Sequence, residues 1–330
     1  MLKKTAHLPQ LPDWLPPLLA CLFFLAAGAL FLPRLGLQND EALFASPWFA
    51  PRDSAYAIKV GHSTLPLMLL SYLGTLKSWI YRPLFRYLGT DILVVRLPML
   101  LAATASVWLF YEFLRKVAGR RAAYIGCGLL AVDATYLLTA CFDWGPVALQ
   151  HLLLLGGLCL VVKFRQERSE RALAAAFFLF GLAMWDKALA IWMLGAMAVA
   201  GMVVYPRPIL ESFRRRRATL AVLAFLLGAL PLVIYNAKTR LATFRSTVAY
   251  DTSDIAHKAY ILELTADGSG LFDWMVDEDD QTPHPHQPEG FLERASASLA
   301  KWTGRPRRDL LLAAFCLALL LAPLASRQDR

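Results

Sequence analysis

The run WLPPLLACLFFLAAGALFL, Trp14–Leu32, carries no charged residue and ends at Pro33. A bilayer is crossed by about 20 consecutive apolar residues, so this run is long enough to span one. Similar blocks recur along the 330-residue chain. We expect about eight spans, at residues 14–32, 93–114, 122–141, 145–162, 172–184, 188–205, 218–236 and 309–325. The blocks predict an all-α integral membrane protein built as a helical bundle.

The overall composition agrees with a membrane protein. Hydrophobic residues make up 57% of the chain and charged residues 18%, with a mean hydropathy of +0.46. Soluble domains are about half apolar and a quarter charged. The net charge of +9 is not accompanied by a nucleic-acid recognition motif, so we expect no nucleic-acid partner. The five cysteines lie in or beside apolar blocks without CxxC spacing and are expected to be packing residues.

Basic residues between the blocks predict the orientation in the membrane. They gather in loops on one side of the alternating path, at residues 3–4, 115–121, 163–171 and 214–217. Such loops are typically cytoplasmic. The first loop (33–92), the turns at Asp143 and Lys187, and the loop from Asn236 to Asp309 then lie outside. We expect a bacterial cytoplasmic (inner) membrane protein with these outer segments on the periplasmic face.

The expected domain organisation follows from these spans. Residues 1–240 form a seven-span module that includes the first outer loop, 33–92. An outer hydrophilic loop covers 241–308, and a last span with a cytoplasmic tail covers 309–330. Within the first loop, Leu65–Ile80 is apolar but contains Lys77. A crossing there would invert every later loop, so we expect an interfacial amphipathic helix.

Two adjacent carboxylates, Asp40 and Glu41, follow the first span by about eight residues. Residues that anchor a helix at a membrane surface are normally Trp, Tyr, Lys and Arg, so this pair calls for another explanation. Asp40 could cap a short helix that begins at Glu41. Alternatively, one carboxylate could act as a general base while the other orients it or binds a ligand. The residues alone leave both interpretations open.

A second group of polar residues stands at the start of the fourth span. Asp143 would cap that helix, and Gln150 lies seven residues further on the same helix face, with His151 adjacent. Polar groups that enter a membrane are costly unless they line a cavity. These three residues are therefore candidates for substrate binding.

Basic residues also occur at the outer ends of spans. Lys187 could form a surface ion pair with Asp186, or it could contact a phosphate. Arg96 could extend harmlessly to the membrane surface or bind phosphate. His62 in the first loop is a further candidate ligand. A divalent metal is a candidate cofactor, without an assigned site.

Several short segments together resemble a known group of enzymes, the glycosyltransferases of the GT-C fold that use lipid-linked sugars. The similarity is to the protein O-mannosyltransferase and aminoarabinose transferase branch, or glycosyltransferase family 39, and extends over about residues 10–240. The segments that carry it are NDEA (39–42), LMLLSYLG (67–74), VRLP (95–98), FDWGP (142–146), GLAMWDK (181–187) and YN (235–236).

This resemblance implies a GT-C-like fold and a reaction. A sugar would pass from a polyprenyl-phosphate donor to a protein or glycolipid acceptor, with inversion. Asp40 would be the catalytic base and Glu41 would help to hold the ligands. Asp143 would contribute to the donor or metal site, and Lys187 and Arg96 would contact the carrier phosphate.

Two other classes of function compete with this interpretation. One is a non-catalytic transporter or flippase of the polyprenyl lipid, whose binding sites would lie near the midplane, often at broken helices. Here the candidates cluster at the outer ends, and Asp133 alone lies deep in a span. The other is an assembly subunit without activity. Related enzymes commonly have eleven or more spans, so a partner membrane subunit is also a candidate.

Overall fold

The fold is seen in a computed structural model. It describes residues 12–33, 36–141, 147–212, 214–247, 254–267 and 287–303, together with a few positions beyond residue 312. The chain divides into two compact units, Met1–Ala249 and Tyr250–Arg330.

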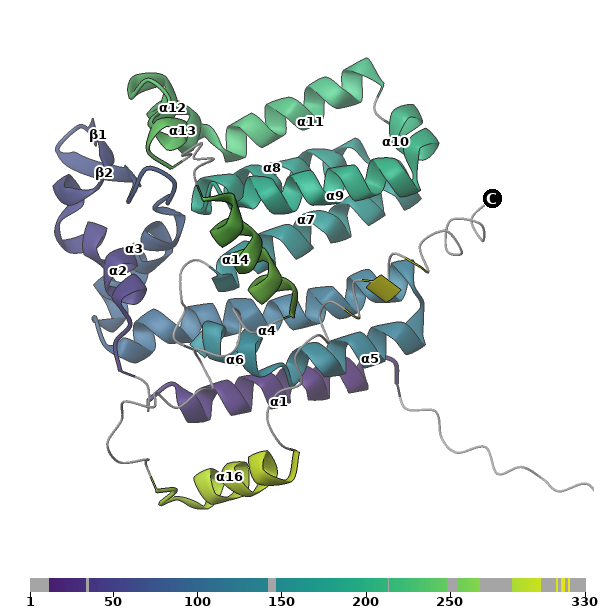
Figure 1. Cartoon of the computed structure of the whole chain (residues 1–330). Coiled ribbons are helices and arrows are strands. Elements are labelled where there is room, and N and C mark those ends of the chain that lie inside the picture. Colours follow the sequence, from purple (N-terminus) through teal and green to yellow (C-terminus); the bar gives the residue numbers. More distant parts are fainter. Residues whose placement is uncertain are drawn as a thin grey trace, which may run out of the picture. The chain divides into compact units, whose positions relative to one another are not determined.

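The first unit is a bundle of helices that run side by side, with successive long helices antiparallel (Figure 1). Its helices are α1 (Leu15–Phe31), α4 (Ile92–Val117), α5 (Arg120–Ala131), α6 (Ala134–Cys141), α7 (Val147–Glu167), α8 (Glu170–Asp186), α9 (Ala190–Val204), α10 (Pro206–Ser212), α11 (Arg215–Gly228) and α12 (Leu230–Lys238). The most extensive packing is that of α11 on α8, α8 on α7, α7 on α4, and both α1 and α5 on α4.

Few of these helices are long and apolar enough to cross a membrane as a single span. Among the described residues, α4 and α7 are long and apolar enough, and the total is four if two bent pairs each count as one span. The pairs are α5 with α6, bent by 55°, and α11 with α12, bent by 73°. Helices α1 and α9 are apolar but shorter, at 17 and 15 residues. The expected helical class is confirmed, whereas the expected count of about eight spans is not; the run at 309–325 lies mostly outside the described residues.

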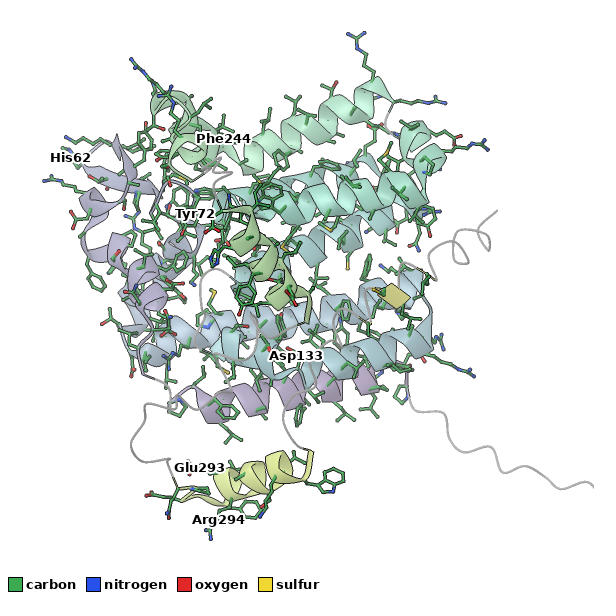
Figure 2. All side chains as sticks on the ribbon, viewed as in Figure 1. His62, Tyr72, Asp133, Phe244, Glu293 and Arg294 are labelled. Atoms are coloured by element: carbon green, nitrogen blue, oxygen red, sulfur yellow. The ribbon has the colours of Figure 1, made fainter. Side chains whose placement is uncertain are left out.

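The break between α5 and α6 has a local cause. Asp133 follows the end of α5, and its Oδ1 accepts a hydrogen bond of 2.6 Å from the backbone N–H of Tyr136. An aspartate that bonds an N–H three residues ahead caps a new helix. Asp133 is exposed (Figure 2). The residue expected deep in a span therefore starts α6 at a bend.

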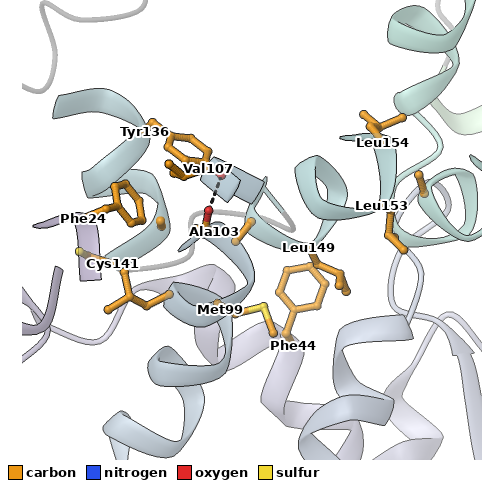
Figure 3. Close-up of a cluster of buried hydrophobic side chains, with 14 of the residues drawn as sticks. Phe24, Phe44, Met99, Ala103, Val107, Tyr136, Cys141, Leu149, Leu153 and Leu154 are labelled. Atoms are coloured by element: carbon orange, nitrogen blue, oxygen red, sulfur yellow. Dashed lines mark hydrogen bonds between the residues drawn. The ribbon is translucent and has the colours of Figure 1, made fainter. Parts of the chain in front are cut away.

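The core of the bundle joins the first loop to the long helices. Phe44 lies against Met99 of α4 and Leu149 of α7, and all three are buried (Figure 3). Nearby, the Tyr136 hydroxyl donates a hydrogen bond of 3.2 Å to the carbonyl of Ala103. This cluster fixes the first loop on the ends of α4 and α7.

Helices α8 and α11 approach closely because glycines face one another. A Cβ placed on Gly181 would lie 2.1 Å from the carbonyl oxygen of Phe225, and one on Gly228 would lie 2.2 Å from that of Phe178. No larger residue fits such contacts, because the obstructing atoms belong to backbone.

The first loop folds differently from the expectation in one part. Residues Leu65–Met68 belong to a strand, and the helix begins only at Leu76, so the interfacial helix expected over Leu65–Ile80 is wrong for its first half. The loop contains α2 (Asn39–Phe49), the turn η1 (Pro51–Asp53), the antiparallel strands β1 (Tyr56–Val60) and β2 (Ser63–Met68), and α3 (Leu76–Leu88).

Tertiary pairing explains this departure from the helical pattern. The segment after β2 bonds to the end of α8: the N–H of Gly74 donates to the carbonyl of Asp186 at 3.1 Å, and that of Ala188 to Tyr72 at 2.9 Å. These backbone groups are satisfied across the structure and do not need a helix. A Cβ on Gly74 would lie 1.9 Å from the Trp185 carbonyl oxygen, so the approach requires glycine.

The two ends of the bundle differ in character. One end, named the hairpin end, holds α2, α3, the β1–β2 hairpin, the last turn of α8 and α12 (Figure 1). The other, named the basic end, holds the α4–α5, α7–α8 and α10–α11 connections, where most of the basic runs lie. At the basic end Arg120 pairs with Asp13 at 2.9 Å, and Arg216 with Glu170 at 3.4 Å.

After α12, the described residues include three short helices. Helix α13 (Ala242–Thr247) still belongs to the first unit, where the Thr243 hydroxyl donates to the Ser71 carbonyl at 2.6 Å. The second unit contains α14 (Ile255–Asp267) and α16 (Phe291–Thr303) among its described residues.

Candidate functional site

A buried ion pair lies where the first loop meets α4. The guanidinium of Arg96 binds both carboxylate oxygens of Glu41, with Nε–Oε1 at 2.6 Å and the other contact at 2.7 Å. Both side chains are 0% exposed. A bidentate pair of this kind is strong and directional. Glu41 also accepts the Gln38 N–H at 2.9 Å, which completes a capping box at the start of α2.

The same arginine reaches the end of the first apolar helix. It donates to the carbonyls of Leu32 and Gly36, at 2.7 and 2.6 Å. A buried charge is tolerated only when such bonds replace water. Arg96 therefore ties α1, the start of the first loop and α2 to α4. These bonds direct its guanidinium to protein acceptors, and its assignment to a carrier phosphate stays a prediction.

Asp40, by contrast, keeps its carboxylate available. It lies in the first turn of α2, is half-exposed, and within the described residues its carboxylate makes no hydrogen bond or ion pair. The residue that caps α2 is Gln38, whose Oε1 accepts the Asp40 N–H at 2.5 Å, so the interpretation of Asp40 as the cap is wrong. The positive end of the helix dipole favours a negative charge here.

Lys187 stands directly after α8 at the hairpin end. Its backbone pairs with Leu73 in an isolated bridge, so the position of the residue is fixed by the first loop. The side chain is half-buried, and no ion pair joins it to Asp186 or to any other described residue. Asp186 itself is fully buried. The surface pair between Lys187 and Asp186 is therefore not seen among the described residues, and the assignment of Lys187 to a carrier phosphate stays a prediction.

The two adjacent polar residues of α7, Gln150 and His151, contact different parts of the structure. The side-chain amide of Gln150 donates to the Lys187 carbonyl at 3.4 Å, which joins these two candidates. His151 instead bonds through Nδ1 to the Val147 carbonyl at 2.8 Å, and its ring lies edge-on to Tyr136 at 5.6 Å between centroids. The adjacent residues thus face different neighbours.

His62 is not brought into this group. His62 is exposed beside Gly61 (φ +59°) at the turn of the β1–β2 hairpin, while Tyr72 lies where the loop meets the bundle (Figure 2). Asp143 lies outside the described residues. Its nearest described neighbour on one side is Cys141, whose thiol donates to the Gly28 carbonyl at 3.6 Å. The described residues include no group of three or more His, Cys, Asp or Glu side chains able to hold a metal ion.

The sequence interpretation missed several residues near these candidates. Lys77 is fully buried, with its ammonium 3.8 Å from the centroid of the Phe44 ring. The sequence feature that could have indicated Lys77 is that it is a single charged residue within an apolar stretch. Trp48, Trp79 and Arg82 also gather at the hairpin end, around a cavity. Their spacing gave no signal, because they come from two helices separated by the hairpin.

These observations describe a helical membrane protein in which four of the candidates, Asp40, Glu41, Arg96 and Lys187, lie at the hairpin end of the bundle. Residues 74–235 match the dolichyl-phosphate-mannose-protein mannosyltransferase family. The match confirms the resemblance to GT-C glycosyltransferases, and the family indicates a membrane glycosyltransferase of the mannosyltransferase type. No curated protein sequence matches the chain.

The matched segment is narrower than the resemblance expected over residues 10–240. It includes Arg96, Gln150, His151 and Lys187, whereas the Asp40–Glu41 pair precedes it. The roles of Asp40 and Glu41 therefore rest on their geometry and on the resemblance of the first loop.

Proposed function

We propose that this protein transfers a sugar from a polyprenyl-phosphate carrier to a hydroxyl or amine of a protein or glycolipid acceptor. One observation carries the proposal. In a single helical turn, Glu41 is buried and held by Arg96, while Asp40 keeps a half-exposed carboxylate with no described partner. Glu41 thus fixes the first loop to α4, while the carboxylate of Asp40 can contact a substrate.

Asp40 serves as the general base. It takes the proton of the acceptor as the acceptor oxygen or nitrogen attacks the anomeric carbon, and the bond from that carbon to the carrier phosphate breaks with inversion. A positioned base contributes about 10²–10⁴-fold to such a step. The capping box and the Glu41–Arg96 pair keep α2 in place, which favours a productive geometry.

Lys187 stabilises the departing polyprenyl phosphate. A lysine binds phosphate as a point charge, and stabilisation of charge that develops in the transition state is usually the largest contribution to catalysis. The bridge to Leu73 and the bond from Gln150 hold the backbone of Lys187. The ammonium is therefore carried on a rigid support, together with the loop that carries Asp40.

The orientation in the membrane supports this assignment. The basic end holds most of the basic loops and is assigned to the cytoplasm by the positive-inside rule. The hairpin end then faces outward, and a polyprenyl chain can stay in the lipid while its sugar reaches Asp40. We propose on these grounds that the site faces away from the cytoplasm, which in a bacterial inner membrane is the periplasmic side.

A transporter of the polyprenyl lipid is the second candidate, because the structure contains the bent pairs α5–α6 and α11–α12. Broken helices often line the binding sites of transporters. At the first break, however, Asp133 is occupied in capping α6. The polar candidates instead gather at the hairpin end, which favours the transferase.

The two candidates differ in their response to Asp40→Asn. Membrane lipids from a deletion strain, analysed by mass spectrometry, would identify the lipid-linked sugar that accumulates. That lipid then serves as donor for the purified protein in liposomes. Asp40→Asn should lower transfer by at least about 100-fold and keep donor binding. Asp53→Asn, an exposed acid of the same loop, is the matched control; equal transfer by the two variants would exclude Asp40 as the base.

A further inference from the structure

A cavity of about 170 Å³ lies within the first loop, between α2, β2 and α3. Most of its lining precedes residue 74, outside the segment that matches the mannosyltransferase family. The lining side chains that carry the argument are Trp48, Ser63, Thr64, Trp79 and Arg82. None of these residues has a part in the proposed transfer.

The walls of this cavity are held by hydrogen bonds. The hydroxyl of Ser78 on α3 donates to the carbonyl of Phe44 on α2 at 2.7 Å. The indole N–H of Trp79 donates to the carbonyl of Pro66 on β2 at 2.8 Å, and the Thr75 hydroxyl donates to the same oxygen at 2.7 Å. Ligand sites are usually preformed in this way.

The chemistry of the lining points to an anion. Arg82 is the charged residue among the lining side chains, and it makes no ion pair with a described residue. Its guanidinium lies 5.9 Å from the centroid of the Trp48 ring. An arginine fork matches the oxygens of a carboxylate or phosphate. The hydroxyls of Ser63 and Thr64 likewise make no hydrogen bond to a described residue and can serve a polar ligand.

The size and the aromatic lining limit the ligand further. A cavity of about 150 Å³ holds a single ring the size of benzene, and sites for larger ligands occupy about 300–1,000 Å³. This cavity therefore accommodates one ring. Indole side chains have an apolar face and pack on flat apolar surfaces, such as the C–H face of a pyranose.

We propose that this cavity binds an anionic sugar ring, such as a hexuronate or a sugar phosphate, as part of a saccharide acceptor. The acceptor assignment rests on the proposed function. Trp48 follows Asp40 by eight residues on α2, which corresponds to about 12 Å along the helix. The bound ring is thus separated from the attacking group, and it anchors the acceptor while another part of the molecule reaches Asp40.

Binding to the full-length protein in detergent, measured by calorimetry, tests the cavity without any donor. The probes are methyl glucuronide, glucose 6-phosphate, neutral methyl glucoside, inorganic phosphate and an acidic peptide. Both anionic sugars should bind about tenfold more tightly than methyl glucoside. Arg82→Gln should abolish this preference. Arg86→Gln, on the same helix but outside the lining, should retain it.

A second variant distinguishes the contribution of the sugar ring to binding from that of the negative charge. Trp48→Leu should weaken methyl glucuronide and methyl glucoside by similar factors and leave inorganic phosphate unchanged. Inorganic phosphate that binds as tightly as glucose 6-phosphate would show an anion site without a sugar, and tighter binding of the acidic peptide would show a peptide site. Either result overturns the proposal, as does an unchanged preference in Arg82→Gln.

The proposal can fail independently of the transfer reaction. Asp40→Asn should bind methyl glucuronide as the wild type does, because Asp40 is not in the cavity lining. Normal transfer by Asp40→Asn would contradict the catalytic proposal and leave the cavity intact. Conversely, Asp40→Asn could lose transfer while the wild type binds anionic sugars no more tightly than methyl glucoside. That result would contradict the proposed cavity ligand and leave the catalytic proposal intact.

Discussion

Arg96 of α4 and Glu41 of α2 form a fully buried, two-point ion pair between residues 55 positions apart in the chain. The pair links the first loop to the helical bundle at the place where Asp40 is presented. Its energetic and functional consequences can be separated by mutation.

Removal of one member of the pair should strongly destabilise the protein. Glu41→Gln leaves the Arg96 charge buried without its counter-charge, and breaking a buried pair costs about 3–5 kcal/mol. The double variant Glu41→Gln/Arg96→Met should be less destabilised than the sum of the two single variants. Thermal unfolding in detergent measures these differences; strictly additive effects would contradict a direct coupling.

Asp40→Asn should leave the stability nearly unchanged, within about 0.5 kcal/mol, because the carboxylate has no described partner. Unfolding curves recorded beside those of Glu41→Gln make the comparison. A loss of stability as large as that of Glu41→Gln would indicate a structural role for Asp40 and weaken its assignment as base.

Lys187→Gln should raise KM for the lipid-phosphate donor by about tenfold or more, since a hydrogen bond to a charged group contributes about 1.5–3 kcal/mol. Lys187→Arg should recover part of the affinity. Lys59→Gln removes an exposed cation from β1 and should change little. Donor titrations at fixed acceptor concentration measure the effect. An unchanged KM in Lys187→Gln would argue against phosphate binding.

Gly181→Ala should separate α8 from α11, because the added Cβ would meet the Phe225 carbonyl oxygen at 2.1 Å. Overpacking of this kind costs about 1–3 kcal/mol. Gly195→Ala is the matched control, since no atom lies within 4 Å of a Cβ at that position. It should be neutral or slightly stabilising, because alanine favours helix. Equal unfolding temperatures for the two variants would contradict the close helix contact.

The orientation predicts opposite labelling of the two ends. In a cysteine-free background, His62→Cys at the hairpin turn should react with a membrane-impermeant maleimide in intact cells. Glu211→Cys on α10, at the basic end, should react only after the membrane is opened. Labelling of Glu211→Cys in intact cells would invert the assignment of the two ends.

Much of the helical framework could be predicted from local sequence. Apolar block length depends on neighbouring residues alone, so the helices α1, α4, α7, α9 and α11 fall within or across the expected runs. The number of crossings could not be predicted in the same way. Bends such as that at Asp133 depend on how a side chain caps the next helix, which a hydropathy profile does not show.

The structure of the first loop could not be predicted from its hydrophobic pattern. Its apolar stretch from Leu65 indicates a helix, yet the backbone of Leu73 and Gly74 pairs with the end of α8, more than a hundred residues away. A local pattern carries no information about such a partner. The cavity around Trp48 and Arg82 arises from the same folding of the loop.

By itself, the sequence determined that this is an apolar helical protein with two adjacent acids beyond its first membrane-length run. It also supplied the resemblance to lipid-linked-sugar glycosyltransferases. Only the tertiary structure decided that Glu41 is buried against Arg96 while Asp40 stays accessible. Neighbouring residues of a helix point in different directions, so their environments depend on which distant elements pack against each face.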